Sequence, residues 1–89
     1  MSFELLQPGT IWVYGRKNTN RFFYLYKKNT HESISLIEGD ILLMIAQERY
    51  RTVFNVSKYF FLFRGDEVHK DLADNFLENG WLRYFSPLD

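Results

Sequence analysis

The stretch Glu38-Gly39-Asp40-Ile41-Leu42-Leu43-Met44-Ile45-Ala46 decides the fold class of this chain. Residues 41–46 are apolar without a break, so hydrophobic periodicity cannot separate a buried strand from a piece of helix. The run is short and follows turn residues at positions 38–40, and both features favour a strand. Because this strand is apolar on both faces, we expect it to lie inside a sheet.

The residues before this stretch predict three more strands. Residues 10–14 follow the turn Gln7-Pro8-Gly9 and are rich in β-branched and aromatic side chains. Residues 21–28 also read as a strand, with Phe22, Tyr24 and Tyr26 on one face and Phe23 and Leu25 on the other, and the turn-forming residues 15–20 precede them. We therefore expect strands 10–14 and 21–28 to pair as a hairpin. A polar loop then leads to a short strand at residues 34–37.

The residues after this stretch predict a second hairpin, a helix and a last strand. After a charged loop at residues 47–51, strands 52–54 and 59–63 flank a short connection of irregular type. The apolar residues then take helical spacing, which predicts a helix over residues 66–79 that begins at Asp66 and ends at Asn79-Gly80. The apolar face of this helix consists of Val68, Leu72, Ala73, Phe76 and Leu77. Residues 81–85 read as the last strand, ended by Ser86-Pro87.

These elements predict one mainly β domain over residues 1–89. We expect a small barrel or curled antiparallel sheet of five to seven short strands, with one amphipathic helix before the last strand. A Leu-x-x-Gly-x-apolar unit occurs at residues 6–11 and again at residues 36–41. Over residues 5–63 the pattern resembles SH3-like small barrels, in which such turns open strongly bent strands. The Ala-Leu-Tyr-Asp-Tyr signature of peptide-binding SH3 domains is missing, so the resemblance implies no proline-rich ligand.

Aromatic residues make up 19% of the 89 positions, and a chain of this size can bury that many rings only with difficulty. Either the rings substitute for core size or some of them lie at a partner surface. Short, aromatic-rich chains without cysteine also resemble bacteriophage accessory proteins. No segment has the apolar length of a membrane span or signal peptide, so we expect a soluble protein of the cytoplasm, or of the host cytoplasm if viral.

The formal net charge is zero, but the charges are unevenly placed. Residues 5–31 hold five Lys and Arg and no acid, whereas residues 65–80 hold five acids and one Lys. We expect a protein-interaction module, acting as an adaptor, inhibitor or assembly component, that binds a macromolecular partner or itself through a patch of exposed aromatic residues, with the uneven charge fixing the orientation. The alternative is a nucleic-acid-binding barrel that uses the basic, Tyr-rich first hairpin. The predicted partner-binding residues are Tyr14, Arg16, Lys17, Arg21, Tyr24, Tyr26, Lys28, Tyr59 and Phe61.

No pattern of catalytic or metal-binding residues stands out. Glu67, His69 and Asp71 would share one face of a strand and could then approach a metal ion, but they diverge on the predicted helix. The chain has no Gly-rich phosphate loop and no recognisable spacing of a nucleophile and its base. We expect no enzymatic activity, no cofactor and no metal site.

Overall fold

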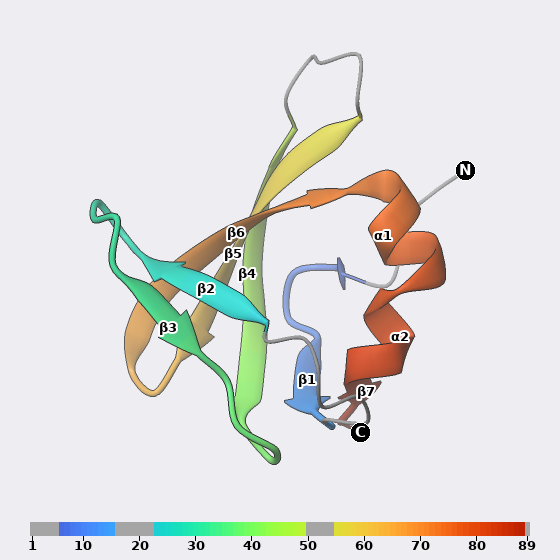
Figure 1. The fold of residues 1–89 in the computed structure, drawn as a ribbon, viewed down its shortest axis with the longest axis horizontal. Helices are drawn as coiled ribbons and strands as arrows, with labels where there is room; N and C mark the ends of the chain where they lie inside the picture. The colour runs from blue at the N-terminus through green and yellow to red at the C-terminus, as the bar shows by residue number, and fades with distance from the viewer. Residues whose placement is uncertain (1–5, 16–22, 50–54, 89) are drawn as a thin grey trace.

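A curled antiparallel sheet of seven strands forms most of the structure, and two short helices stand beside it (Figure 1). The computed structural model describes residues 6–15, 23–49 and 55–88. The strands are β1 (Ile11–Tyr14), β2 (Tyr24–Lys27), β3 (Ser33–Ser35), β4 (Ile41–Arg49), β5 (Val56–Phe63), β6 (Asp66–Ala73) and β7 (Phe85–Pro87). Their order is β3-β2-β6-β5-β4-β1-β7, and the sheet curls into a half-barrel. The predicted fold class, mainly β with a curled antiparallel sheet, is confirmed.

Strand β4 has the internal position expected of a strand that is apolar on both faces. It lies between β5 and β1. The loop predicted at residues 47–51 is wrong for its first three residues, because pairing with β5 continues to Arg49 opposite Ser57. Gln47 and Glu48, which point to opposite faces of the strand, are both exposed, so this end of β4 accommodates polar residues on either face.

The predicted hairpin of the first two strands is wrong. Strand β1 pairs with β4 and β7, whereas β2 pairs with β3 and β6. Turn residues between two strands show where the chain reverses, but the partner of each strand depends on contacts that are distant in sequence. The strand predicted at residues 34–37 is present only in part, because β3 covers residues 33–35 and residues 36 and 37 lie outside it. Part of the first predicted strand pair, residues 16–22, lies outside the described residues.

The second predicted hairpin is also wrong. Strand β5 runs unbroken through residues 56–58, where a connection was expected, and residues 52–54 lie outside the described residues. The hairpin turn lies instead at Arg64 and Gly65, between the paired residues Phe63 and Asp66. Arg64 has φ 52° and Gly65 has φ 82°. Two residues with positive φ are the signature of a type I′ turn, whose twist suits a hairpin.

The helix predicted over residues 66–79 is wrong in its first half. Residues 66–73 form β6, and only residues 74–79 are helical, as α1 (Asp74–Asn79). Val68 and Leu72 are both buried, and a spacing of four residues puts two side chains on one face of a strand as well as of a helix. Pairing with β5 along the whole length of β6 decides between the two.

The end of the chain differs from the prediction as well. Residues 81–84 form a second helix, α2 (Trp81–Tyr84), and the last strand, β7, begins only at Phe85. Gly80, between the helices, has φ −121° and is not a left-handed stop. A Cβ atom at Gly80 would lie 2.7 Å from the Phe76 ring, so close packing explains this glycine.

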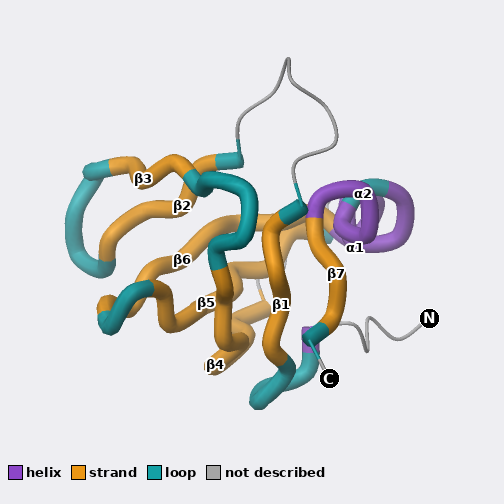
Figure 2. The backbone as a smooth tube through the Cα atoms, turned by 90° about the horizontal axis from the view of Figure 1, so that it is seen from below, coloured by secondary structure: helices purple, strands orange, loops and turns teal. Residues whose placement is uncertain are grey.

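The core fills the inner side of the half-barrel, and α1 and α2 lie at its side next to β7 (Figure 2). Trp81 stacks on Phe85 with ring centroids 4.0 Å apart and meets Trp12 edge to face at 5.6 Å. The buried apolar residues are Leu6, Trp12, Tyr14, Phe23, Leu25, Leu36, Leu42, Met44, Tyr59, Phe61, Phe63, Val68, Leu72, Leu77, Trp81 and Phe85. Among the described residues, no helix has the length and apolar character needed to cross a membrane.

The two Leu-x-x-Gly units form matching turns in front of β1 and β4. Gly9 and Gly39 both have φ 93°, a left-handed conformation that favours glycine. Gly9 N–H donates to the Met44 carbonyl and Gly39 N–H donates to the Tyr14 carbonyl, each at 2.8 Å. Each turn is therefore bonded to the fourth residue of the strand that the other turn opens, which places a local pseudo-twofold axis between β1 and β4.

Candidate interaction surface on the outer face of the sheet

The side chains of the sheet that point away from the core form an outer face, and much of it is apolar. Ile11 lies opposite Leu43, which lies opposite Leu62, so a row of aliphatic side chains crosses β1, β4 and β5. Ile41, next to Leu43 on this face, is 50% exposed, and Leu62 is 38% exposed. We call Ile11, Val13, Ile41, Leu43 and Leu62 the apolar row.

A row of rings continues the apolar row toward the other side of the sheet. Phe60, two residues before Leu62, lies opposite His69, which lies opposite Tyr26. The His69 ring centroid is 5.9 Å from that of Tyr26 and 6.2 Å from that of Phe60. Tyr26 is 38% exposed. We call Phe60, His69 and Tyr26 the ring row, and the two rows together the outer-face surface.

Two open hollows flank the ring row where the turn between β2 and β3 rises beside it. Thr30, His31 and His69 border both of them. The first, of about 400 Å³, is also lined by Tyr26, Lys70 and Asp71. The second, of about 490 Å³, is also lined by Lys28, Asn29, Glu48, Lys58 and Phe60. The ring row is therefore bounded by polar side chains of both charges.

The uneven charge of the sequence is partly balanced inside the fold. The basic strand β2 pairs with the acidic strand β6, and Lys28 Nζ lies 3.2 Å from Glu67 Oε2. Both side chains are at least one-third exposed, so this pair contributes at most about 1 kcal/mol to stability. Its main effect is to reduce the positive charge that the basic segment offers to a partner.

His69, at the centre of the ring row, is held in its neutral form. Burial lowers the pKa of the His69 imidazole, and the positive charge of Lys58 lowers it further, while Asp71 and Glu67 oppose the shift. A neutral imidazole has one N–H donor and one acceptor nitrogen. His69 can therefore both donate to and accept from a polar group of a partner at neutral pH.

The Lys70 side chain connects β6 to β2 beyond the last paired residues of the two strands. Its Nζ donates to the Tyr24 carbonyl at 2.7 Å and lies 4.8 Å from the centroid of the Phe23 ring. Burial lowers the pKa of the Lys70 ammonium, and Asp71 opposes the shift. A third hollow, of about 310 Å³, opens beside Lys70 and is lined by Phe23, Asp71, Leu72, Ala73, Phe76 and Tyr84.

The predicted partner-binding residues lie in three different environments. Tyr14, Tyr59 and Phe61 belong to the core and are at most 2% exposed, so their expected place in an exposed patch is wrong. These rings lie on the inner face, where the curl of the sheet and the helices cover them. Tyr24 and Tyr26 are exposed on β2, and Lys28 pairs with Glu67 beside them. Arg16, Lys17 and Arg21 lie outside the described residues.

Sequence reasoning missed most of the outer-face surface. Phe60 and Leu62 alternate with the buried Tyr59, Phe61 and Phe63, a period of two that assigns them to the opposite face. Ile41 and Leu43 alternate in the same way with Leu42 and Met44. This alternation could have located the surface from the sequence.

Glu67, His69 and Asp71 are on one face of β6, because this segment is a strand and not the predicted helix. Alternate residues of a strand are about 6.6 Å apart, which separates their ligand atoms unless the side chains converge. Among the residues that the structure describes, no three His, Asp or Glu side chains form a cluster able to hold a metal ion.

Comparison of the chain with protein-family models, with curated proteins and with solved structures found no match in any of the three.

Proposed function

We propose that this chain is a small protein-interaction module that binds a macromolecular partner through its outer-face surface. The supporting observation is the apolar row, which crosses three neighbouring strands and includes Ile41 and Leu62 at 50% and 38% exposure. A contiguous apolar area on a sheet face is typical of interaction sites. Such a module serves as an adaptor, an inhibitor or an assembly component.

The border of the surface also fits a protein partner. Protein interfaces combine an apolar centre with a polar rim and are enriched in Tyr. The ring row ends at Tyr26, and the rim beyond it holds side chains of both charges, including Lys28 and Glu67 at 3.2 Å. Mixed charges at a rim orient a partner more than they strengthen its binding.

A charge substitution on the apolar row tests this function. Leu62→Lys puts an ammonium into the middle of the surface, and the aliphatic stem of Lys preserves part of the packing. Leu82→Lys is the matched control, because Leu82 is 58% exposed on α2, outside this face. Immobilised wild-type protein and the control should retain the same proteins from an extract, and Leu62→Lys should lose them. Equal retention by all three variants would contradict the proposal.

Single-stranded nucleic acid is the second candidate partner, because Tyr26, His69 and Phe60 form a row of rings beside Lys28 and Lys58. Rings that stack on bases and cations that contact phosphates are the elements of such sites. The ion pair of Lys28 with Glu67 and the zero net charge favour the protein partner. Fluorescence titration with a single-stranded oligonucleotide at two salt concentrations distinguishes the two candidate partners. A nucleic-acid-binding protein should bind the oligonucleotide with an affinity that falls steeply as salt rises, because phosphate contacts release counterions.

A further inference from the structure

The two outermost strands of the sheet differ in their capacity to pair with another strand. Strand β7 forms one edge and β3 forms the other. An open edge is a row of backbone N–H and C=O groups without partners, and many proteins block it with proline or charge.

The edge at β7 is blocked. Gly15 N–H donates to the Tyr84 carbonyl and Leu88 N–H donates to the Ile11 carbonyl, so alternate residues 84, 86 and 88 face β1. Phe85 and Pro87 therefore face outward. The Phe85 N–H already donates to the Trp81 carbonyl at the end of α2, and Pro87 has no N–H.

Among the residues that the structure describes, none pairs with the outer side of β3, so this edge is open. Lys27 N–H donates to the Glu32 carbonyl, Leu36 N–H donates to the Phe23 carbonyl, and Ile34 lies opposite Leu25. Hydrogen bonding alternates along an antiparallel pair, so residues 32, 34 and 36 of this segment face β2. The N–H and C=O groups of Ser33 and Ser35 therefore point away from the sheet. Both residues are exposed.

We propose that β3 pairs antiparallel with β3 of a second copy of this chain and continues the sheet across a twofold axis. Ser33 and Ser35 stand on either side of Ile34, so pairing Ser33 with Ser35 of the partner subunit satisfies all four outward groups on each copy. Ile34 then lies at the twofold axis opposite its own equivalent, where non-hydrogen-bonded Cα atoms are about 4.5 Å apart.

The charges next to β3 are compatible with a second copy. Over residues 32–36 the only charged side chain is Glu32, and the twofold register places it opposite Leu36 of the partner subunit. Like charges that lie opposite each other destabilise a cross-strand pair, and this register brings no like charges together. This dimer forms through backbone groups of the β3 edge and not through side chains of the outer-face surface. It therefore goes beyond the proposed function, and the two proposals can be tested independently.

Blocking one donor of the edge tests the dimer. Ser35→Pro removes an N–H that points away from β2 and so leaves the β2–β3 bonds in place, while Ser35→Ala keeps this N–H. Sedimentation equilibrium over a concentration series should give a dimer for the wild type and for Ser35→Ala. Because two intermolecular bonds are lost, Ser35→Pro should weaken dimerisation roughly tenfold or more. A wild type that stays monomeric, or a Ser35→Pro variant that dimerises as well as Ser35→Ala, would overturn the proposal.

Cysteine cross-linking is a second measurement that does not depend on the proline variant folding. The chain has no cysteine, so Ile34→Cys introduces a single thiol at the twofold axis. The expected Cα spacing there suits a disulfide. Ile34→Cys should form a disulfide-linked dimer faster than Leu82→Cys, although Ile34 is only partly exposed and Leu82 is 58% exposed. Slower cross-linking at position 34, or a dimer lost in Leu62→Lys but kept in Ser35→Pro, would place the contact elsewhere.

Discussion

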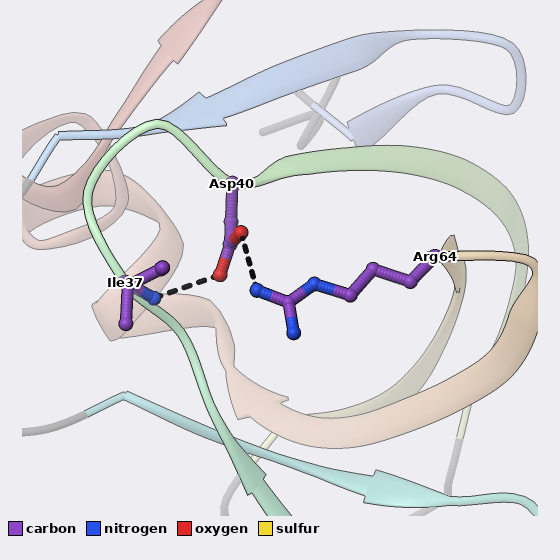
Figure 3. A network of polar contacts seen from close by, with 3 residues as sticks. All are labelled: Ile37, Asp40 and Arg64. Atoms are coloured by element: carbon purple, nitrogen blue, oxygen red, sulfur yellow. Dashed lines mark hydrogen bonds and ion pairs between the residues drawn. The ribbon is translucent and has the colours of Figure 1, made fainter.

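Asp40 accepts a hydrogen bond from Arg64, with 3.0 Å between Oδ1 and Nη2, and thereby joins two turns that are 24 residues apart (Figure 3). The other carboxylate oxygen of Asp40 accepts from the Ile37 N–H at 2.7 Å. Arg64 also lies over the Phe63 ring, 4.7 Å from its centroid. The Asp40 side chain is 11% exposed and that of Arg64 is 59% exposed. One carboxylate therefore fixes the turn before β4 and connects it to the turn between β5 and β6.

The first prediction separates the two bonds of Asp40. Asp40→Ala removes both the bond to the exposed Ile37 N–H and the ion pair with Arg64, and should lower the free energy of unfolding by about 1–2 kcal/mol. Arg64→Ala removes the ion pair and the contact of the exposed guanidinium with the Phe63 ring, and should cost about 1 kcal/mol or less. Urea unfolding measures both, with Glu38→Ala, an exposed position in the same turn, as control. Equal losses for Asp40→Ala and Arg64→Ala would show that the ion pair carries the effect.

The second prediction concerns the junction of α1 and α2. In Gly80→Ala the new methyl group would lie 2.7 Å from two atoms of the Phe76 ring, so the substitution should cost on the order of 1–3 kcal/mol. Gly15→Ala is the matched control, because the nearest atom there, the Tyr84 carbonyl oxygen, is 4.0 Å away. Thermal unfolding followed by circular dichroism measures both. A Gly80→Ala protein as stable as Gly15→Ala would mean that the Phe76 ring moves aside freely.

The third prediction ranks three side chains of the helices by burial. Trp81 is fully buried and stacks on Phe85, so Trp81→Ala should cost on the order of 3–5 kcal/mol or unfold the chain. Phe76 is only partly buried, so Phe76→Ala should cost less than Trp81→Ala. Leu82→Ala should be near neutral, since Leu82 is 58% exposed. Urea unfolding followed by far-ultraviolet circular dichroism gives the order, and a Phe76→Ala loss equal to that of Trp81→Ala would contradict it.

The fourth prediction is a pH dependence that originates at His69. Burial is the main cause that lowers the pKa of this imidazole below its ordinary value of about 6.5, with a contribution from Lys58. Between the lowered folded-state pKa and about 6.5 the unfolded chain binds more protons, so the free energy of unfolding falls as pH falls through this window. His69→Phe should remove that part of the dependence while retaining a ring between Tyr26 and Phe60.

Urea unfolding at about pH 7.5 and at about pH 5, for the wild type and His69→Phe, measures this difference. The carboxylates contribute to both proteins, so the comparison isolates the imidazole. An identical pH dependence, or an NMR titration of His69 with a midpoint above about 6.5, would contradict the assignment.

Local patterns predicted the fold class because the strands are made of residues that suit a sheet. The run at residues 41–46 indicated an internal strand, and β4 is internal. Helix and strand were confused where the spacing is ambiguous, as at Val68 and Leu72. Residues 66–73 form a strand because they pair with β5, and this pairing cannot be predicted from the pattern of residues 66–73 alone.

Strand pairing and ring burial were predicted less well, because both depend on contacts between residues that are distant in the sequence. Strand β1 pairs with β4 and β7, which are far from it in the sequence, and no local turn signal predicts such pairing. Tyr59 and Phe61 were predicted to bind a partner, but both are buried. The face that becomes the core is set by the curl of the sheet and by where Trp81 docks.

The position of β1 between β4 and β7 also determines the order in which the chain can fold. Strands β4, β5 and β6 follow one another in the sequence and pair with their neighbours, so this meander requires the closure of short loops only. The bond from Leu88 N–H to the Ile11 carbonyl and the contact of Trp12 with Trp81 join opposite ends of the chain. Because long-range pairing is slow, we expect the meander to form first and tryptophan fluorescence to report the last step of folding.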